Sequence, residues 1–429
     1  MEPNPQTSPK RYRNTAFVID QTAAHFDMAY RLKVMGISGR SLARRDVQLR
    51  LQSGGEARAE GDRVVDFVRC SYLGLDNHPK VVEGALSAIE SYRSVHWSCA
   101  RTRLNFGLLQ DLEAQLSALF ASRVIAFSSV MLANLGALPL IASGHLTDGV
   151  KPVMVFDRLC HVSLAYHKPV VASETEVTTI GHNDLAALEA ICKANPCVAY
   201  IADGVYSMGG SAPIPELRRL QERYNLFLYI DDAHGISLFG DHGEGYARSQ
   251  LPAALGPRSI VAASLGKGFG ASGGILLLGT AQQEDLFRRY AQPYAFSAAP
   301  NLAAVGAALA SAEIHASPEL GRLQKILRER IRAFDERVCT PQRGCPLPIR
   351  TVPIGREEDA ILAAKSLMER GVYTSAIFFP TVARGAAGLR ICVTATHTPE
   401  DLRTLCSLIE GIRQWQDFDP PSTQARLAS

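Results

Sequence analysis

The chain is predicted to fold as an α/β protein with a mostly parallel sheet, followed by a smaller α+β domain. Short apolar runs alternate with stretches of helical spacing between about residues 61 and 300, which is the pattern of a doubly wound sheet. After about Phe296 the pattern changes to long helical stretches with few strands. One apolar run, from Leu226 to Ile230, ends at Asp231 and Asp232, as a buried parallel strand does at the ligand-binding edge of such a sheet.

The first 60 residues are expected to form an N-terminal arm. Residues 1–9 are polar and proline-rich, so we expect a disordered start and no signal peptide. Roughly helical spacing of apolar residues extends over about residues 15–51. Glycines at 54–55 and 61 then mark a turn before an apolar segment at 64–68.

Two domains and a tail are expected after the arm. The large domain should cover residues 61–300, with strands at 124–127, 153–156, 198–201, 227–230, 260–262 and 274–278. The small domain should cover residues 301–415, with helices at 302–317, 320–338 and 399–415 and strand-like segments at 350–354, 372 and 389–394. Residues 416–429 are polar and contain proline, which predicts a tail.

The composition is typical of an enzyme-sized globular protein. Its 429 residues are 47% hydrophobic and 20% charged, and the formal net charge is only +3. Since no basic cluster is interleaved with aromatic residues, neither a nucleic acid nor a membrane is expected as a partner. Polar residues and Pro139 interrupt the most apolar window, residues 124–146, which favours buried structure over a membrane span.

The nine cysteines are scattered singly, which predicts reduced thiols in the cytoplasm and no metal site.

Two segments predict a pyridoxal-phosphate site. Lys267 lies among glycines, 33 residues after His234, where close backbone packing can desolvate the ammonium and lower its pKa enough for imine formation. Asp231 can keep a pyridinium nitrogen protonated, so that the ring accepts electrons. Each feature alone is more often structural, and Lys267 is not a P-loop lysine because the G-x-x-x-x-G-K order is absent. Their conjunction favours the cofactor site.

A series of short segments extends this interpretation to most of the chain. They are 72–79, 127–129 with 133–134, 157–163, 182–184, 203–208, 231–234, 264–270, 389–390 and 394–398. In this order and spacing, the set resembles the α-oxoamine synthases, a family of fold-type-I pyridoxal-phosphate enzymes. The resemblance implies a seven-stranded type of sheet in the large domain.

The resemblance implies roles for residues around the cofactor ring, beside those of Lys267 and Asp231. His161 matches the histidine that stacks on the ring, and its nitrogen would lie close to the substrate. His234 matches the residue that hydrogen-bonds the phenolic oxygen of the ring. Ser207 matches a nearby polar contact, and Asp203 stands where some relatives have glutamate.

The cofactor phosphate is expected at the start of a helix, where backbone N–H groups and hydroxyls can hold a dianion. Ser129, Val130, Met131 and Ser264 fit this need. The family usually has glycine and an aromatic residue where Val130 and Met131 stand. The segment 296–300 also lacks a threonine by which relatives help to hold the phosphate across the dimer interface. These departures alter the phosphate cup or the face above the ring.

The substrates are expected to contact Arg390, Arg103 and Cys70. Arg390 matches the arginine that grips the amino acid's carboxylate, because a guanidinium offers a planar, two-pronged contact. A structural salt bridge is the alternative for this residue. Cys70 stands where relatives have asparagine, which puts the ordinary substrates of the family in question.

The resemblance implies a condensation between an amino acid and an acyl thioester, carried by coenzyme A or an acyl carrier protein, with loss of the carboxylate. Lys267 would remove the Cα proton, and His161 would assist the acyl carbonyl. A homodimer with the site at the interface is also implied. Two alternatives stay open. Transamination or retro-aldol cleavage on the same scaffold would need no acyl donor, and a non-enzymatic supporting subunit would be expected to lack Lys267.

Overall fold

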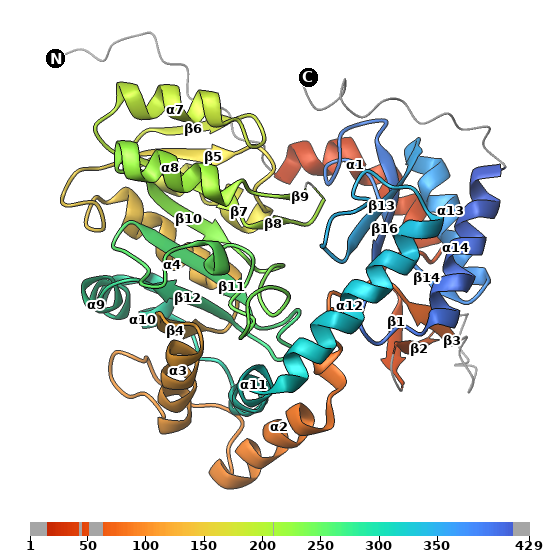
Figure 1. The fold of residues 1–429 in the computed structure, drawn as a ribbon, viewed down its shortest axis with the longest axis horizontal. Coiled ribbons are helices and arrows are strands. Elements are labelled where there is room, and N and C mark those ends of the chain that lie inside the picture. Colours follow the sequence, from red (N-terminus) through yellow and green to blue (C-terminus); the bar gives the residue numbers. More distant parts are fainter. Residues whose placement is uncertain (1–14, 43–44, 51–62, 209, 415–429) are drawn as a thin grey trace.

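The structure is a computed structural model that describes residues 15–42, 45–50, 63–208 and 210–414. The expected disordered start and polar tail lie outside these residues. A large sheet with its helices forms one side of the molecule, and two smaller sheets form the other (Figure 1).

The large sheet has seven strands in the order β4-β12-β11-β10-β7-β5-β6. Their bounds are β4 Arg123–Phe127, β5 Val153–Asp157, β6 Val177–Ile180, β7 Val198–Asp203, β10 Phe227–Asp231, β11 Ser259–Ser264 and β12 Gly274–Leu278. Only β12 runs antiparallel to its neighbours. The mostly parallel α/β fold and the six predicted strands are confirmed. The prediction missed β6, an edge strand whose central threonines are not buried.

Helices cover both faces of this sheet, because alternate strand residues face opposite sides. Val124 and Ala126 belong to one apolar core, with residues of α3, α7, α8 and α11. Ile125 and Phe127 belong to the other, with residues of α4, α9 and α10. The helices are α2 Pro79–Tyr92, α3 Gly107–Leu119, α4 Val130–Ala142, α5 Val162–Ala165, α6 Lys168–Val171, α7 Leu185–Ala194, α8 Ile214–Tyr224, α9 Ala281–Tyr290, α10 Gln292–Phe296 and α11 Leu302–His315.

A three-stranded antiparallel sheet forms the core of the C-terminal part, in the order β13-β16-β15. Its elements are β13 Ile349–Gly355, β15 Ser375–Ile377, β16 Ala387–Cys392, α12 Pro318–Arg337, α13 Glu357–Glu369 and α14 Pro399–Gln414. The helices and strands expected here are confirmed, except that β15 and α13 were not foreseen.

The N-terminal segment is joined to this C-terminal part. A second small sheet has the order β1-β2-β3-β14, made of β1 Ser38–Ser41, β2 Asp46–Arg50, β3 Arg63–Asp66 and β14 Val372–Tyr373. The expected helical stretch over residues 15–51 is therefore wrong after α1, Thr15–Arg31. Lys33, two residues after α1, has a positive φ of 56°, and the Val34 amide donates to the Ala29 carbonyl oxygen at 3.0 Å, a left-handed geometry that ends helices.

Two glycines allow the segments that carry candidate site residues to pack closely together. Gly274 pairs with Ser264 in the sheet, and a Cβ on Gly274 would overlap the backbone of Ser129 and Val130. The start of α4 therefore packs directly on the ends of β11 and β12. Gly270 has a positive φ of 76°, and a Cβ there would overlap Leu75 in the short 3-10 helix Leu75–Asn77. The loop with Lys267 is thereby fixed against this helix.

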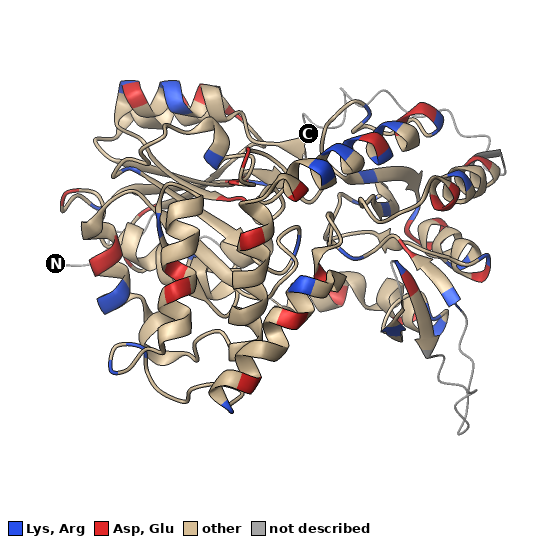
Figure 2. Ribbon diagram, turned by 60° about the horizontal axis from the view of Figure 1, so that its bottom comes forward, with Lys and Arg blue, Asp and Glu red and all other residues tan. Residues whose placement is uncertain are grey.

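Charges of both signs are interspersed along the peripheral helices, while the interior strands carry few (Figure 2). None of the helices in the described ranges is long and apolar enough to cross a bilayer.

Candidate active site

The carboxyl ends of the parallel strands bring several polar side chains to one edge of the sheet. Asp231, the last residue of β10, is in register with Asp203 at the end of β7 and with Ala262 of β11. Lys267 follows three residues after β11 ends at Ser264. This edge is where ligands bind in open α/β sheets.

Asp231 is held in one orientation by a buried amide. Its side chain is buried, and its two oxygens accept hydrogen bonds from Asn134 Nδ2 at 3.0 Å and from the Ala233 amide at 3.0 Å. The Tyr229 hydroxyl donates to Asn134 Oδ1 at 2.6 Å, which fixes which end of the amide faces the carboxylate. The aspartate is therefore rigidly placed at the end of its strand.

The side chain of Asp232 does not share the hydrogen bonds of Asp231. Its carboxylate accepts a hydrogen bond from the Ala247 amide at 2.8 Å and is packed against Gly204, Gly235 and Gly245. Burial raises the pKa of Asp232 well above its usual value. A neutral, enclosed carboxyl group has a structural role here, so Asp231 is the better candidate for a ring nitrogen.

The ring of His161 is oriented by Ser163 and Asn134. His161 Nδ1 accepts a hydrogen bond from the Ser163 amide at 3.2 Å and lies 2.8 Å from the Ser163 hydroxyl. That hydroxyl accepts from Asn134 Nδ2 at 3.0 Å, so it donates its own proton to His161. Because Nδ1 is an acceptor, the neutral imidazole carries its proton on Nε2. His161 thus presents an N–H donor from an exposed ring.

Lys267 lies in a chain of hydrogen bonds with His234 and Tyr72. Lys267 Nζ is 3.0 Å from His234 Nε2, and His234 Nδ1 is 2.7 Å from the Tyr72 hydroxyl. Burial lowers the pKa of Lys267, although Asp231 opposes this effect. Burial also lowers the pKa of His234 well below its usual value. A neutral His234 can accept a hydrogen bond from Lys267 and so orient the amine, while burial itself favours the neutral, reactive form of the amine.

Asp203 is the second buried acid at the sheet edge. It accepts a hydrogen bond from the His161 amide at 3.0 Å, and so it fixes the loop that carries this histidine. Burial, with a contribution from the charge of Asp231, raises the pKa of Asp203 well above its usual value. Asp203 is therefore a buried acid that holds backbone at this edge, in contrast to Asp231, whose side chain is held by Asn134.

The expected phosphate contacts lie on one side of the edge. Ser129 is the N-cap of α4 and accepts a hydrogen bond from the Leu132 amide at 3.3 Å, while the amides of Val130 and Met131 belong to the first turn, which has no intrahelical acceptors. Ser264 accepts from the Gly266 amide at 3.2 Å, so its hydroxyl proton can point outward. The helix start, with these two hydroxyls, offers donors suited to a dianion.

Arg390 lies among sulfur atoms. Its guanidinium nitrogens are 3.2 Å from Cys392 Sγ and 3.6 and 3.8 Å from Cys70 Sγ, and its Nε donates to the Ser207 carbonyl oxygen at 3.4 Å. Within the described ranges, these contacts are with sulfur and carbonyl groups, and none is with a carboxylate. A half-buried cation without a carboxylate partner favours an anionic ligand. Ser207 contributes its backbone to this arrangement.

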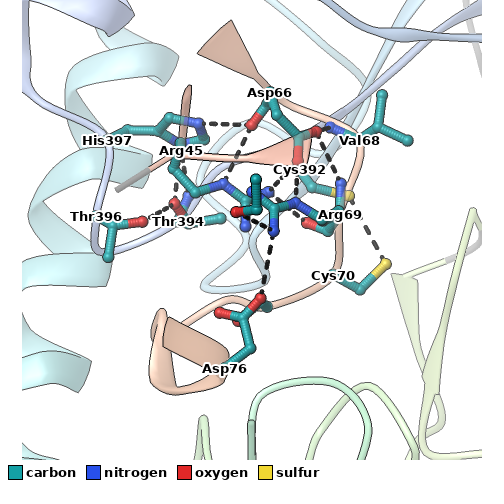
Figure 3. A network of polar contacts seen from close by, with 12 residues as sticks. Arg45, Asp66, Val68, Arg69, Cys70, Asp76, Cys392, Thr394, Thr396 and His397 are labelled. Carbon is teal, nitrogen blue, oxygen red and sulfur yellow. Dashed lines mark hydrogen bonds and ion pairs between the residues drawn. The ribbon is translucent and has the colours of Figure 1, made fainter. Parts of the chain in front are cut away.

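A buried polar network holds the segment that carries Cys70 (Figure 3). Asp66 accepts hydrogen bonds from the amides of Val68 and Arg69 at 2.7 and 3.1 Å. The backbone oxygen of Asp66 accepts from Arg45 Nε at 3.2 Å and from His397 Nε2 at 3.0 Å. The segment is therefore fixed to the same part of the fold as Arg390.

Arg103 does not join the site in the described structure. It is exposed, and its amide donates to the Ala100 carbonyl oxygen in the turn before α3. Its neighbour Arg101 is buried and forms a 2.5 Å ion pair with Glu113. Nothing in the described ranges connects Arg103 with Arg390 or Lys267, so its substrate contact stays a prediction.

Sequence reasoning missed the roles of four residues. Asn134, Ser163 and Tyr72 lie inside the recognised segments, but only the fold shows that their side chains orient the aspartate and the two histidines. Cys392 had a usable signal, since residues two apart in a strand share a face, and it lies two residues after Arg390.

The donor set fits pyridoxal phosphate. A buried strand-end carboxylate, a lysine with a lowered pKa and a helix start with hydroxyls match the ring nitrogen, the aldehyde and the phosphate of that cofactor. The fold and this site together are those of a pyridoxal-phosphate-dependent transferase.

Comparison with known proteins gives the family. The model of the aminotransferase class I and II family matches residues 104–409. An 8-amino-7-oxononanoate synthase of Maricaulis maris is 33% identical over 391 residues, which are 89% of this chain and 95% of that protein. The chain belongs to the aminotransferase class I and II family and, within it, to the α-oxoamine synthases.

Solved structures agree on the fold. A structure of serine palmitoyltransferase with PLP has a TM-score of 0.80 at 20% identity, covering 94% of this chain and 100% of that chain. An 8-amino-7-oxononanoate synthase from Francisella tularensis has a TM-score of 0.67 at 20% identity, covering 83% of this chain and 99% of that one. These structures confirm the predicted fold, and the family match and the curated relative confirm the predicted family and cofactor.

Proposed function

We propose that this chain condenses an amino acid with an acyl thioester and releases the carboxylate as carbon dioxide, giving an α-amino ketone. One observation carries the proposal. The guanidinium of Arg390 is half-buried, and its contacts within the described ranges include no carboxylate. Family membership supports the reaction class. The residues described above support the individual roles.

Arg390 is proposed to hold the amino acid's carboxylate. A guanidinium grips a carboxylate through two parallel N–H groups, and the partly buried setting strengthens this contact. Cys70 and Cys392 flank the same guanidinium, so they would border the amino acid's backbone. The substrate carboxylate would thereby replace sulfur contacts with charge-assisted hydrogen bonds.

Lys267 is proposed to remove the Cα proton. Its pKa is lowered by burial, which favours the neutral amine that can remove a proton, and His234 lies 3.0 Å from its Nζ and can orient it by a hydrogen bond. Bound pyridoxal phosphate would supply an electron sink for the charge left on Cα, with Asp231 facing the ring nitrogen and Ser129 and Ser264 facing the phosphate.

His161 is proposed to act on the acyl carbonyl oxygen. The hydrogen bonds from Ser163 leave its proton on Nε2, so the neutral ring donates a hydrogen bond. That donor would stabilise negative charge that develops on the oxygen when the carbon–carbon bond forms. Loss of His161 should slow turnover strongly without abolishing it, because such assistance contributes about 10²–10⁴-fold.

The thioester could be carried by coenzyme A or by an acyl carrier protein, and a homodimer is proposed as the working form. The family resemblance implies the dimer, and large apolar side chains are exposed on the described surface, including Phe296 at 83%, Leu104 at 56% and Met131 at 47%, which an interface would cover where they form a contiguous patch. The proposed compartment is the cytoplasm, in keeping with nine free cysteines.

The test is a matrix of amino acids and acyl donors with purified protein loaded with pyridoxal phosphate. Glycine, alanine and serine should be combined with acyl-coenzyme A and acyl-carrier-protein series of increasing length. Thioester loss and carbon dioxide release should appear together, in equal amounts, in at least one combination. Amino-acid turnover that needs no acyl donor would instead establish a transaminase or lyase.

A further inference from the structure

Two cysteines form a cluster with Arg390, and the proposed condensation makes no use of the reactivity of their sulfur atoms. Cys70 Sγ and Cys392 Sγ lie 3.9 Å apart, although 322 residues separate them in sequence. Cys70 is half-buried and Cys392 is buried. The guanidinium of Arg390 contacts both sulfurs, so a thiolate and a thiol can lie side by side against a fixed positive charge.

The surrounding structure holds the two sulfurs in this arrangement. The Cys392 amide donates to the Phe67 carbonyl oxygen at 2.8 Å, and the Phe67 ring stacks on His397 with centroids 3.9 Å apart. The Asp66 network then fixes the backbone just before Cys70 (Figure 3). A disulfide needs the sulfurs at about 2.05 Å, so side-chain rotation has to bring them together by about 2 Å.

Cys70 differs from the other buried thiols in its electrostatic surroundings. The charged and titratable groups that face it are Cys392, Arg390, Tyr72 and Lys267. The Cys392 thiol and the Arg390 guanidinium lower the pKa of Cys70 well below that of an ordinary thiol, and burial opposes them only in part. By contrast, burial raises the pKa of Cys192 to about 11. A thiolate is the nucleophilic form of cysteine.

We propose that Cys70 and Cys392 are a modification site, at which a hydroperoxide converts the two thiols into a disulfide beside Arg390. The Cys70 thiolate attacks the terminal peroxide oxygen, the O–O bond breaks, and the sulfur is oxidised by two electrons to a sulfenic acid while hydroxide leaves from hydrogen peroxide, or alkoxide from an organic hydroperoxide. The Cys392 thiol then attacks that sulfur. The S–S bond forms, the S–O bond breaks, and water leaves with the proton of Cys392.

Oxidation of Cys70 is coupled to the binding of the amino acid's carboxylate at Arg390, and this coupling rests on the proposed function. A carboxylate bound to Arg390 takes the N–H groups that stabilise the thiolate, so Cys70 becomes protonated and less reactive. By thermodynamic reciprocity, an ionised Cys70 weakens carboxylate binding by the same factor. The amino acid should therefore protect Cys70 from oxidation and alkylation.

The first experiment maps disulfides by peptide mass spectrometry after hydrogen peroxide treatment of the full-length protein. A linked pair of peptides containing Cys70 and Cys392 is expected, and a reductant should reverse it. In Cys392→Ser, Cys70 should stop at a sulfenic acid that dimedone traps. In Cys339→Ser, which removes an exposed thiol as a control, the link should form as in the parent. Absence of the link in a folded parent would overturn the proposal.

The second experiment follows iodoacetamide alkylation of Cys70 against pH by the same mapping. Between about pH 6 and 8 the rate should change by less than threefold, whereas an ordinary thiol, with a pKa of about 8.5, gains almost tenfold per pH unit. A rate for Cys70 that rises like that of an ordinary thiol would contradict the thiolate. Protection by the amino acid tests only the coupling, so its failure alone would count against Arg390 as the carboxylate contact and not against the disulfide.

Discussion

The two sides of the candidate site differ in how completely their polar groups are partnered. On the ring side, Asp231, Asn134, Ser163 and His161 form a continuous series of hydrogen bonds at 2.8–3.0 Å. On the carboxylate side, Arg390 contacts two sulfurs and a carbonyl oxygen. With the roles proposed above, this difference would suit the ring side to a group that stays bound and the carboxylate side to one that enters and leaves in each turnover.

The largest effect should follow from Lys267→Ala on the ring side. Without the amine, no group is placed to bind the cofactor covalently or to remove the Cα proton, so turnover should fall by roughly 10⁴-fold or more. Borohydride reduction of the parent, followed by peptide mapping, should label Lys267. Lys168→Ala, which removes another half-buried lysine, is the control and should keep the label. Label on any other lysine would show that the ring side has been placed wrongly.

Asp231→Asn should separate chemistry from cofactor binding. The amide keeps the shape of the carboxylate but cannot hold a ring nitrogen protonated, so exchange of the amino acid's Cα proton should slow by on the order of 10²–10⁴-fold. Cofactor absorbance should remain. Exchange in heavy water, followed by NMR, measures this directly. Parental exchange would point to Asp203, the other acid at this edge.

Arg390→Lys tests the carboxylate side. The lysine keeps the positive charge but loses the two-pronged contact, so amino-acid affinity should fall by roughly 1.5–3 kcal/mol, or about ten- to a hundredfold. Cofactor absorbance should hardly change, because no ring-side hydrogen bond involves Arg390. Spectral titration with amino acids is the measurement. If the variant binds amino acids as well as the parent does, Arg390 does not hold the carboxylate. If it loses the cofactor, Arg390 also supports the ring side, and the two sides are not independent.

The smallest effect is expected for Ser163→Ala. The variant removes one hydrogen bond to His161 Nδ1 but leaves the backbone amide that also donates to it. A loss of about 1 kcal/mol, or about fivefold in kcat/KM, follows, and the pH profile should shift because the hydroxyl no longer biases the tautomer. Ser163→Thr keeps the hydroxyl and should restore the profile. If the pH dependence of kcat/KM is unchanged in Ser163→Ala, the serine contributes only to packing.

The sequence allowed prediction of the features that rest on local patterns. Asp231 could be placed because an apolar run stops at it, and Lys267 because glycines surround it. Six strands of the large sheet followed from apolar runs, whereas a seventh was implied only by the resemblance, because β6 has a half-polar pattern. The Cys70–Cys392 cluster could not be foreseen, because it depends on the docking of β16 beside a segment 322 residues earlier. The strands β1 and β2 were mistaken for helix, because short polar edge strands carry little periodic signal.

The parallel pairing of β3 with β14 has a consequence for how the protein is made. Val65 is paired with Val372, so the ribosome must add about 300 residues after β3 before β14 can pair with the edge of β3 that faces away from β2, which takes about 15–60 s at typical rates of synthesis. During that time β3 is an unprotected sheet edge on the nascent chain. Truncated chains that end before residue 372 should therefore associate with one another or with chaperones more than the full chain does, which pull-down of stalled nascent chains can measure.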